Sequence, residues 1–207
     1  GQQLEASQAT WQVLGQQVLM GRMELPAPLL MDILSPGSGV SLPAYAALLA
    51  KAQVNPASLT AAEKAILAQP SIPYNLDAWD GYAVARETVL ATARSLGKNL
   101  VVLAGDTHNA WASELRDRSG QAVGVEFATS SVSSPGFEEY LSGQDPAQLR
   151  GALLQFISTL KYCDTSRRGY MIVTATPQAC QAEWIYVDTV FSRHCLLYTS
   201  PSPRDRG

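Results

Sequence analysis

Apolar and polar positions along the chain alternate between strand-like and helix-like patterns. The segment Thr10–Met20 mixes alternation with a central Gly15 and predicts a short strand that runs toward a loop. The apolar, β-branched run Leu100–Ala104 predicts a buried strand. Three further strands are expected, at Ala122–Ala128, Tyr170–Ala175 and Ala182–Thr189.

Helix signals fall between these strands. Thr60 and Glu63 form a capping box that starts a short helix, which stops before Pro70. A helix is predicted over Asp77–Leu96, with Gly97 as its stop and an apolar face of Val84, Val89, Leu90 and Ala93. Two more helices are predicted, one over Ala110–Arg116 and one from the Asp145-Pro146 start to about Thr159.

The order of these elements predicts the fold class. A strand–helix–strand unit followed by antiparallel strands favours an α/β or α+β layered fold in one domain, residues 1–193. Residues 25–57 are rich in Pro, Ser, Gly and Ala without a sustained period, so we expect a loop-rich insertion with a helical turn or two at Ala44–Gln53. Residues 194–207 form a Ser/Pro/Arg tail that resembles translated linker or adaptor sequence, and we expect it to be non-native and disordered.

Composition narrows the function classes. The chain has 207 residues, of which 46% are apolar, enough for one ordinary core. Its net charge of −3 does not suggest a nucleic-acid surface. No apolar run approaches the roughly 20 residues that span a bilayer. The first residues, GQQLE, carry neither an initiator Met nor a signal peptide, so we expect either a removed leader or a start inside a longer protein.

The loop Gly105–Asn109 is the strongest candidate for chemistry. It follows the predicted buried strand at Leu100–Ala104, and the carboxyl ends of such strands gather ligands in α/β proteins. On an extended loop, Asp106 and His108 point the same way, as two metal ligands would. The alternative is that Asp106 caps a helix and His108 is a surface side chain. A metal site also needs ligands from elsewhere, because a protein metal centre takes three or more.

Other polar residues are candidates for substrate binding or support, each with a plainer alternative. Asp80 lines a cleft or complements a helix dipole. Arg167 and Arg168 contact a phosphate or form a solvated turn pair. Asn109 supports a ligand carboxylate or caps a helix that begins at Ala110.

Five ordered blocks resemble the PhoD-like alkaline phosphatases of the calcineurin-like metallophosphoesterase superfamily. The likeness runs from about Thr10 to Arg193, and its main block resembles the family's late metal-binding motif. The blocks are Asn75–Tyr82 (NLDAWDGY), Asn99–Leu115 (NLVVLAGDTHNAWASEL), Val125–Gly136 (VEFATSSVSSPG), Leu160–Tyr170 (LKYCDTSRRGY) and Glu183–Val190 (EWIYVDTV).

This resemblance implies an αββα sandwich and the hydrolysis of phosphate mono- and diesters at an Fe³⁺–Ca²⁺ centre. It implies that Asp106 and His108 are metal ligands, that phosphate esters are the substrates, and that the protein is periplasmic or extracellular. The family's early Asp-rich blocks have no counterpart before Thr10. We therefore expect the C-terminal part of a phosphatase, with an incomplete metal centre and no activity without its missing N-terminal part. The alternatives are a phosphodiesterase or phospholipase, or a metal-free binding domain.

Overall fold

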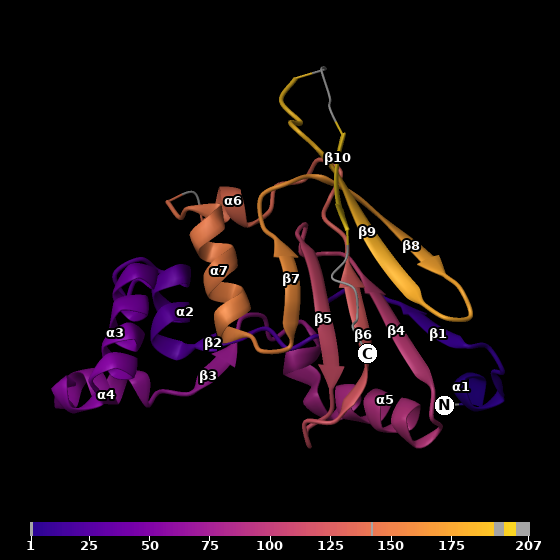
Figure 1. The fold of residues 1–207 in the computed structure, drawn as a ribbon, viewed down its shortest axis with the longest axis horizontal. Coiled ribbons are helices and arrows are strands. Elements are labelled where there is room, and N and C mark those ends of the chain that lie inside the picture. The colour runs from indigo at the N-terminus through magenta and orange to yellow at the C-terminus, as the bar shows by residue number, and fades with distance from the viewer. Residues whose placement is uncertain (1, 142, 193–196, 202–207) are drawn as a thin grey trace.

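The computed structural model describes residues 2–141, 143–192 and 197–201, which form two sheets and several helices (Figure 1). The larger sheet has the strand order β1-β4-β6-β5-β7. Strands β1, β4 and β6 are parallel, whereas β5 is antiparallel to both of its neighbours. The strands are β1 (Trp11–Gly15), β4 (Asn99–Ala104), β5 (Ala110–Arg116), β6 (Ala122–Ala128) and β7 (Leu160–Asp164).

Strand β4 is apolar from Leu100 to Ala104, where both of its faces are covered. Leu100 and Val102 pack with Leu90 and Ala93 of α5 (Ala83–Ser95) on one face. Val101 alternates to the other face, where a second sheet lies. A continuous apolar run is the pattern expected of a strand buried on both sides, and the prediction of a strand here is confirmed.

The second sheet consists of β8 (Gly169–Ala175), β9 (Cys180–Val187) and β10 (Leu197–Pro201), all antiparallel. Trp184 of β9 is fully buried against Phe127 of the larger sheet, and its indole Nε1 donates to the carbonyl oxygen of Ala128 at 2.9 Å. On the opposite face of the larger sheet, α7 (Pro146–Phe156) packs through Leu149 and Leu153. The layers therefore run helices, large sheet, small sheet, which is a mixed α/β fold (Figure 1).

A helical segment extends beside α7 (Figure 1). Leu29, Leu42 and Tyr45 bury one another against Ala152 of α7, and this packing stabilises the helices of this segment. The helical turns expected at Ala44–Gln53 are confirmed within a longer helix, but the loop-rich expectation for residues 25–57 is wrong, since most of them are helical. The segment contains β2 (Glu24–Pro26), α2 (Ala27–Leu34), α3 (Leu42–Val54), η1 (Pro56–Ser58), α4 (Ala61–Leu67) and β3 (Ser71–Pro73).

The predicted helix at Ala110–Arg116 is also wrong, because these residues form strand β5. Trp111 and Leu115 face the helices, whereas Ala110 and Ala112 face the small sheet, which is the period of two that a strand requires. Pairing on both sides, with β6 and β7, overrides the helix propensity of Ala, Glu, Leu and Arg.

Element ends differ from prediction in two further places. The helix expected from Asp77 begins at Ala83 after a 3₁₀ turn, η2 (Trp79–Tyr82), and Val84 is exposed rather than part of the apolar face. Residues 197–201 form β10, so the expectation of a wholly disordered tail is wrong there, while residues 194–196 and 202–207 lie outside the described part. The remaining helices are α1 (Gln2–Ala6) and α6 (Phe137–Tyr140).

The predicted caps are confirmed. The Thr60 hydroxyl accepts from the Glu63 amide, and the Glu63 carboxylate accepts from the Thr60 amide. Asp145 caps α7, and Gly97 follows α5 with a positive φ of 61°. None of the described helices is long and apolar enough to cross a bilayer.

Candidate functional site: the loop after β4

The loop Gly105–Asn109 lies at the carboxyl end of β4, between the segments that follow its parallel neighbours β1 and β6. The Gly105 amide donates to the Gln17 carbonyl at 3.0 Å, and the Thr129 amide donates to the Ala104 carbonyl at 3.1 Å. The loop thus occupies the edge where parallel sheets place their ligands.

Asp106 and His108 both adopt left-handed backbone conformations, with φ of 64° and 60°. They are the only non-glycine residues with positive φ in the described part of the chain. The Thr107 amide turns back to the Gly105 carbonyl at 2.7 Å, so the loop is tightly coiled and the expectation of an extended loop is wrong. Such backbone persists only where its surroundings hold it, and it is frequent at functional sites. One such restraint is the Trp111 indole, which donates to the Thr107 hydroxyl at 2.8 Å.

The His108 ring is fixed by a backbone carbonyl. Its Nδ1 lies 2.7 Å from the Pro135 oxygen, in the loop that follows β6. A carbonyl oxygen only accepts, so Nδ1 carries the proton and donates, and in the neutral imidazole the lone pair for a metal is then on Nε2. This is the arrangement by which proteins orient a histidine for metal ligation.

Asn109 is completely buried beside His108. Its Oδ1 accepts from the Phe137 amide at 3.2 Å, and its carboxamide packs against Gly136 so closely that a Cβ there would lie 2.4 Å from Nδ2. Its helix-capping alternative is wrong because no helix begins at Ala110. Asn109 instead ties the loop after β4 to the loop after β6.

Unpartnered buried polar atoms concentrate around these two loops. In the described part of the chain, four buried side-chain nitrogens or oxygens lack a hydrogen-bond partner. They are Asn109 Nδ2, Ser130 Oγ, Glu138 Oε2 and Arg168 Nε. Native structures leave few such atoms, and a group of them marks a place where a ligand, ion or water completes the bonding.

The Asp106 side chain is exposed, and its only side-chain hydrogen bond to the described residues is a long one, 3.4 Å, from Gln17 Nε2. Burial raises the pKa of the nearby Tyr74 hydroxyl, and the charges of Tyr140 and Asp106 raise it further. Tyr74, Tyr140 and Phe137 line an apolar hollow of about 190 Å³. The charge of the Asp106 carboxylate thus acts on Tyr74, which belongs to this hollow.

Asp80 belongs to a different group, which anchors the loop between β1 and β2. Its carboxylate accepts from the Met23 amide at 2.8 Å, and burial raises its pKa. The buried Glu126 holds the same loop, accepting from the Met20 and Gly21 amides at 2.6 and 2.7 Å. The structure places Asp80 among these anchors, and it shows no contact with Asp106 or His108 in the described residues.

Arg167 and Arg168 are both ion-paired. Arg167 binds Asp164 at 2.6 Å and lies 4.1 Å from the ring centroid of Tyr186. Arg168 is buried and binds Glu138, whose carboxylate also accepts from the Gly136 amide. The description of the two arginines as a solvated turn pair is therefore wrong, and Arg168 supports the loop that holds His108.

The described residues contain no group of three or more His, Cys, Asp and Glu side chains arranged to hold a metal ion. Asp106 and His108 stay predicted metal ligands, one with a carboxylate oxygen and the other with an imidazole nitrogen. Sequence reasoning missed the Pro135 carbonyl, Gln17 and Glu138, because none of them stands in a motif that marks its role.

A comparison with protein families shows to which family the chain belongs. The family described as PhoD-like phosphatase matches residues 1–184. The chain belongs to this family. As a PhoD-like chain, it is 33% identical over 116 residues to "Alkaline phosphatase D" of Bacillus subtilis (strain 168), an alignment that covers 54% of this chain and 19% of that protein.

The fold is similar to that of a solved PhoD structure. The chain described as "Structure of PhoD" matches with a TM-score of 0.61 and 24% sequence identity, over 96% of this chain and 30% of that one. The PhoD-like chain therefore spans about a fifth of its curated relative and under a third of the solved one. The predicted α/β fold and the resemblance to this family are confirmed.

Proposed function

We propose that the intact protein hydrolyses phosphate mono- and diesters at a binuclear metal centre, and that this chain is its C-terminal part. Membership of the PhoD-like phosphatase family supports phosphoester hydrolysis. The observation that supports the assignment of a site is the His108 Nδ1 to Pro135 contact, which orients the ring and leaves Nε2 for a metal, in the same loop as the exposed Asp106 carboxylate.

The donor set fits half of such a centre. An imidazole nitrogen suits iron and a carboxylate oxygen suits Ca²⁺, so His108 and Asp106 would hold one metal or one member each of an Fe³⁺–Ca²⁺ pair. The metals, when bound, neutralise phosphate charge and supply or stabilise the attacking oxygen. The missing ligands would come from an N-terminal part of the same protein, so we expect this chain alone to be inactive.

The chain's own residues have separate tasks in this proposal. Pro135 holds the His108 ring in one tautomer, and Asn109 fixes the distance between the two loops. Asn109 Nδ2 and Arg168 Nε keep unused donor capacity beside the loop that holds His108. We place the protein in the periplasm or outside the cell, as such phosphatases are exported.

Metal analysis of the purified chain is the first test. We expect fewer than two metal ions per 207-residue chain. Two bound metal ions per chain would overturn the proposal that this chain carries only half of the metal centre. The coding sequence upstream of Gly1 is the second test. An Asp-rich strand-end motif is expected there, and unrelated sequence would contradict the phosphatase assignment.

Activity is tested in the longer protein with p-nitrophenyl phosphate and bis-p-nitrophenyl phosphate. Asp106→Asn is expected to lower kcat at least 100-fold, whereas the control Asp77→Asn, at another exposed aspartate, is expected to leave it within twofold. The ratio of kcat/KM for the monoester to kcat/KM for the diester distinguishes a phosphatase from a phosphodiesterase. Full activity in Asp106→Asn would favour the metal-free alternative for this segment.

A further inference from the structure

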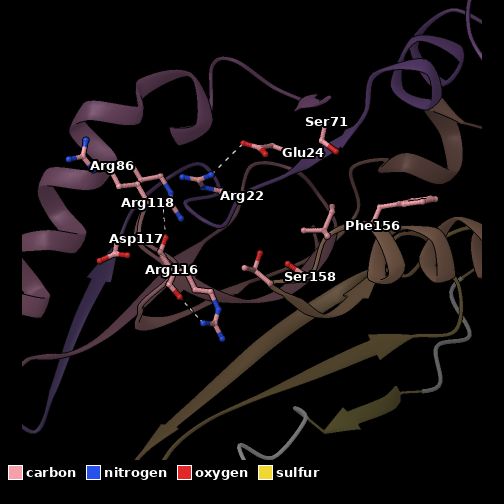
Figure 2. Close-up of a pocket in the computed structure, with 12 residues that line it drawn as sticks. Arg22, Glu24, Ser71, Arg86, Arg116, Asp117, Arg118, Phe156 and Ser158 are labelled. Atoms are coloured by element: carbon pink, nitrogen blue, oxygen red, sulfur yellow. Dashed lines mark hydrogen bonds and ion pairs between the residues drawn. The ribbon is translucent and has the colours of Figure 1, made fainter. Parts of the chain in front are cut away.

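A second cavity, of about 300 Å³, lies at the far end of β5 from the Asp106–Asn109 loop. Four arginines from three segments line it: Arg22 from the loop after β1, Arg86 from α5, and Arg116 and Arg118 around the β5–β6 turn (Figure 2). We call this cavity the arginine pocket. Because β5 begins at Ala110 and ends at Arg116, the strand separates this pocket from the candidate metal ligands.

Two of the lining charges are already neutralised by neighbours. The Arg116 guanidinium donates to Glu114 at 2.7 and 2.9 Å and to the Gly120 carbonyl at 2.9 Å. Asp117 accepts from Arg94 at 2.5 Å and from amides of its own turn. Neither Arg116 nor Asp117 therefore sets the net charge of the pocket.

The other charged side chains on the pocket wall are mostly cationic. Arg22, Arg86 and Arg118 line the pocket together with Glu24, whereas the carboxylates of Asp80, Glu87 and Glu126 do not line it but favour the Arg86 cation. Arg22 lies 3.9 Å from Glu24 and from Glu87, and Arg86 lies 3.1 Å from Glu87. The exposed Arg118 guanidinium makes no hydrogen bond or ion pair with the described residues, so it is the lining cation without a described carboxylate partner.

Arg86 is held firmly at the pocket wall. The residue is 2% exposed, and burial and the nearby Arg22 charge lower its pKa, whereas the charges of Asp80, Glu87 and Glu126 raise it. Its Nε and Nη1 donate to the Met20 and Arg116 carbonyls, so the guanidinium cannot turn away. Repulsion between Arg22 and Arg86 is relieved by an anion that contacts both.

The neutral lining includes three hydroxyl donors beside the apolar Phe156 and Ile157. The hydroxyls of Ser71, Ser158 and Thr159 border the pocket and have no hydrogen-bond partner among the described residues. Guanidinium and hydroxyl donors together match the oxygens of a phosphate group. A volume of about 300 Å³ exceeds that of one phosphate and is at the lower end of small-molecule sites.

We propose that the arginine pocket binds a small phosphate-bearing anion, with Arg22, Arg86 and Arg118 as its cationic ligands. The site would be independent of the metal centre, because none of its residues belongs to the loops that hold Asp106 and His108. Binding rests on direct charge contacts, so it weakens as the salt concentration rises.

Calorimetric titration of the 207-residue chain with pyrophosphate, and separately with inorganic phosphate, tests the proposal. EDTA in the buffer removes metals. We expect saturable binding that Arg118→Ala and Arg22→Ala each weaken about three- to tenfold, the loss of one exposed charged contact. Both side chains are exposed enough for the fold to tolerate their removal, and circular dichroism checks this.

Arg150→Ala is the matched control, because it removes one exposed arginine outside the pocket. It is expected to bind as the parent does, and so is His108→Asn. The proposal is overturned if neither anion binds, if Arg118→Ala binds as tightly as Arg150→Ala, or if His108→Asn abolishes binding. The last result would place the anion at the candidate metal loop instead.

Discussion

The Nδ1 atom of His108 lies 2.7 Å from the carbonyl oxygen of Pro135 and so ties the loop after β4 to the loop after β6. The backbone of His108 is left-handed, with φ of 60°, and the ring contact is one of the restraints that hold it. One nitrogen of the ring is thus used for structure and the other is available for ligation.

Replacement of His108 by Asn separates these two roles. The Asn carboxamide nitrogen reaches about as far as Nδ1 and keeps the bond to Pro135, but nothing replaces Nε2. We expect a change in the free energy of unfolding below about 1 kcal/mol. In the longer protein we expect metal affinity to fall at least tenfold. Metal titration and urea unfolding measure the two effects, and unchanged metal affinity would exclude His108 as a ligand.

Gly136→Ala is expected to destabilise the fold by about 1–3 kcal/mol, the usual cost of overpacking. A Cβ at this position would lie 2.4 Å from Asn109 Nδ2, and the buried carboxamide has no room to move. Gly151→Ala is the matched control, because Gly151 lies within α7 and its Cβ would meet nothing within 4 Å. The free energy of unfolding of that variant is expected to rise by about 0.5–1 kcal/mol, because Ala has a higher helix propensity than Gly. Equal effects of the two substitutions in urea unfolding would contradict the close packing.

Glu126 is expected to make stability depend on pH. Burial raises its pKa from 4.5 to about 7, although the Met20 and Gly21 amides oppose the rise. Between these two values the folded protein retains a proton that the unfolded chain has released, so the free energy of unfolding falls as pH rises, by at most about 3 kcal/mol.

Glu126→Gln removes this titration while keeping the size of the side chain. Its amide also loses one of the two accepted hydrogen bonds, so we expect a less stable protein at pH 5 with a flatter profile between pH 5 and pH 8. Urea unfolding at the two pH values measures the difference. A slope that is the same in parent and variant would show that Glu126 is ionised throughout this range.

Thr60→Ala is expected to lower the free energy of local opening of α4 by about 1 kcal/mol, because the Glu63 amide loses its capping acceptor. Hydrogen exchange of the α4 amides is the measurement, since it reports the local opening of one helix. Thr88→Ala, at an exposed position inside α5, is the control and is expected to cost nothing because Ala favours a helix interior. If α4 exchanges at the parent rate in Thr60→Ala, the capping box does not stabilise it.

Local chemistry alone predicted the caps and the buried strand. Thr60, Asp145 and Gly97 act on backbone groups a few residues away, so their roles follow from the neighbouring sequence. The run Leu100–Ala104 could be assigned because a strand covered on both faces has no polar positions. The position of Asp106 and His108 directly after that strand was predicted for the same reason.

Long-range contacts decided what the sequence left open. Trp111 and Ala112 lie in a strand only because β6 and β7 pair with them, and Leu29 and Tyr45 lie in helices because α7 buries them. The coiled form of the loop and the Pro135 contact to His108 depend on a segment 27 residues away, whose approach no local pattern encodes. The sequence by itself determined which residues are candidate metal ligands, since residue type and the position after a strand are local. Only the tertiary structure decided which nitrogen of His108 contacts Pro135 and which arginines share a pocket, because packing sets the directions of side chains.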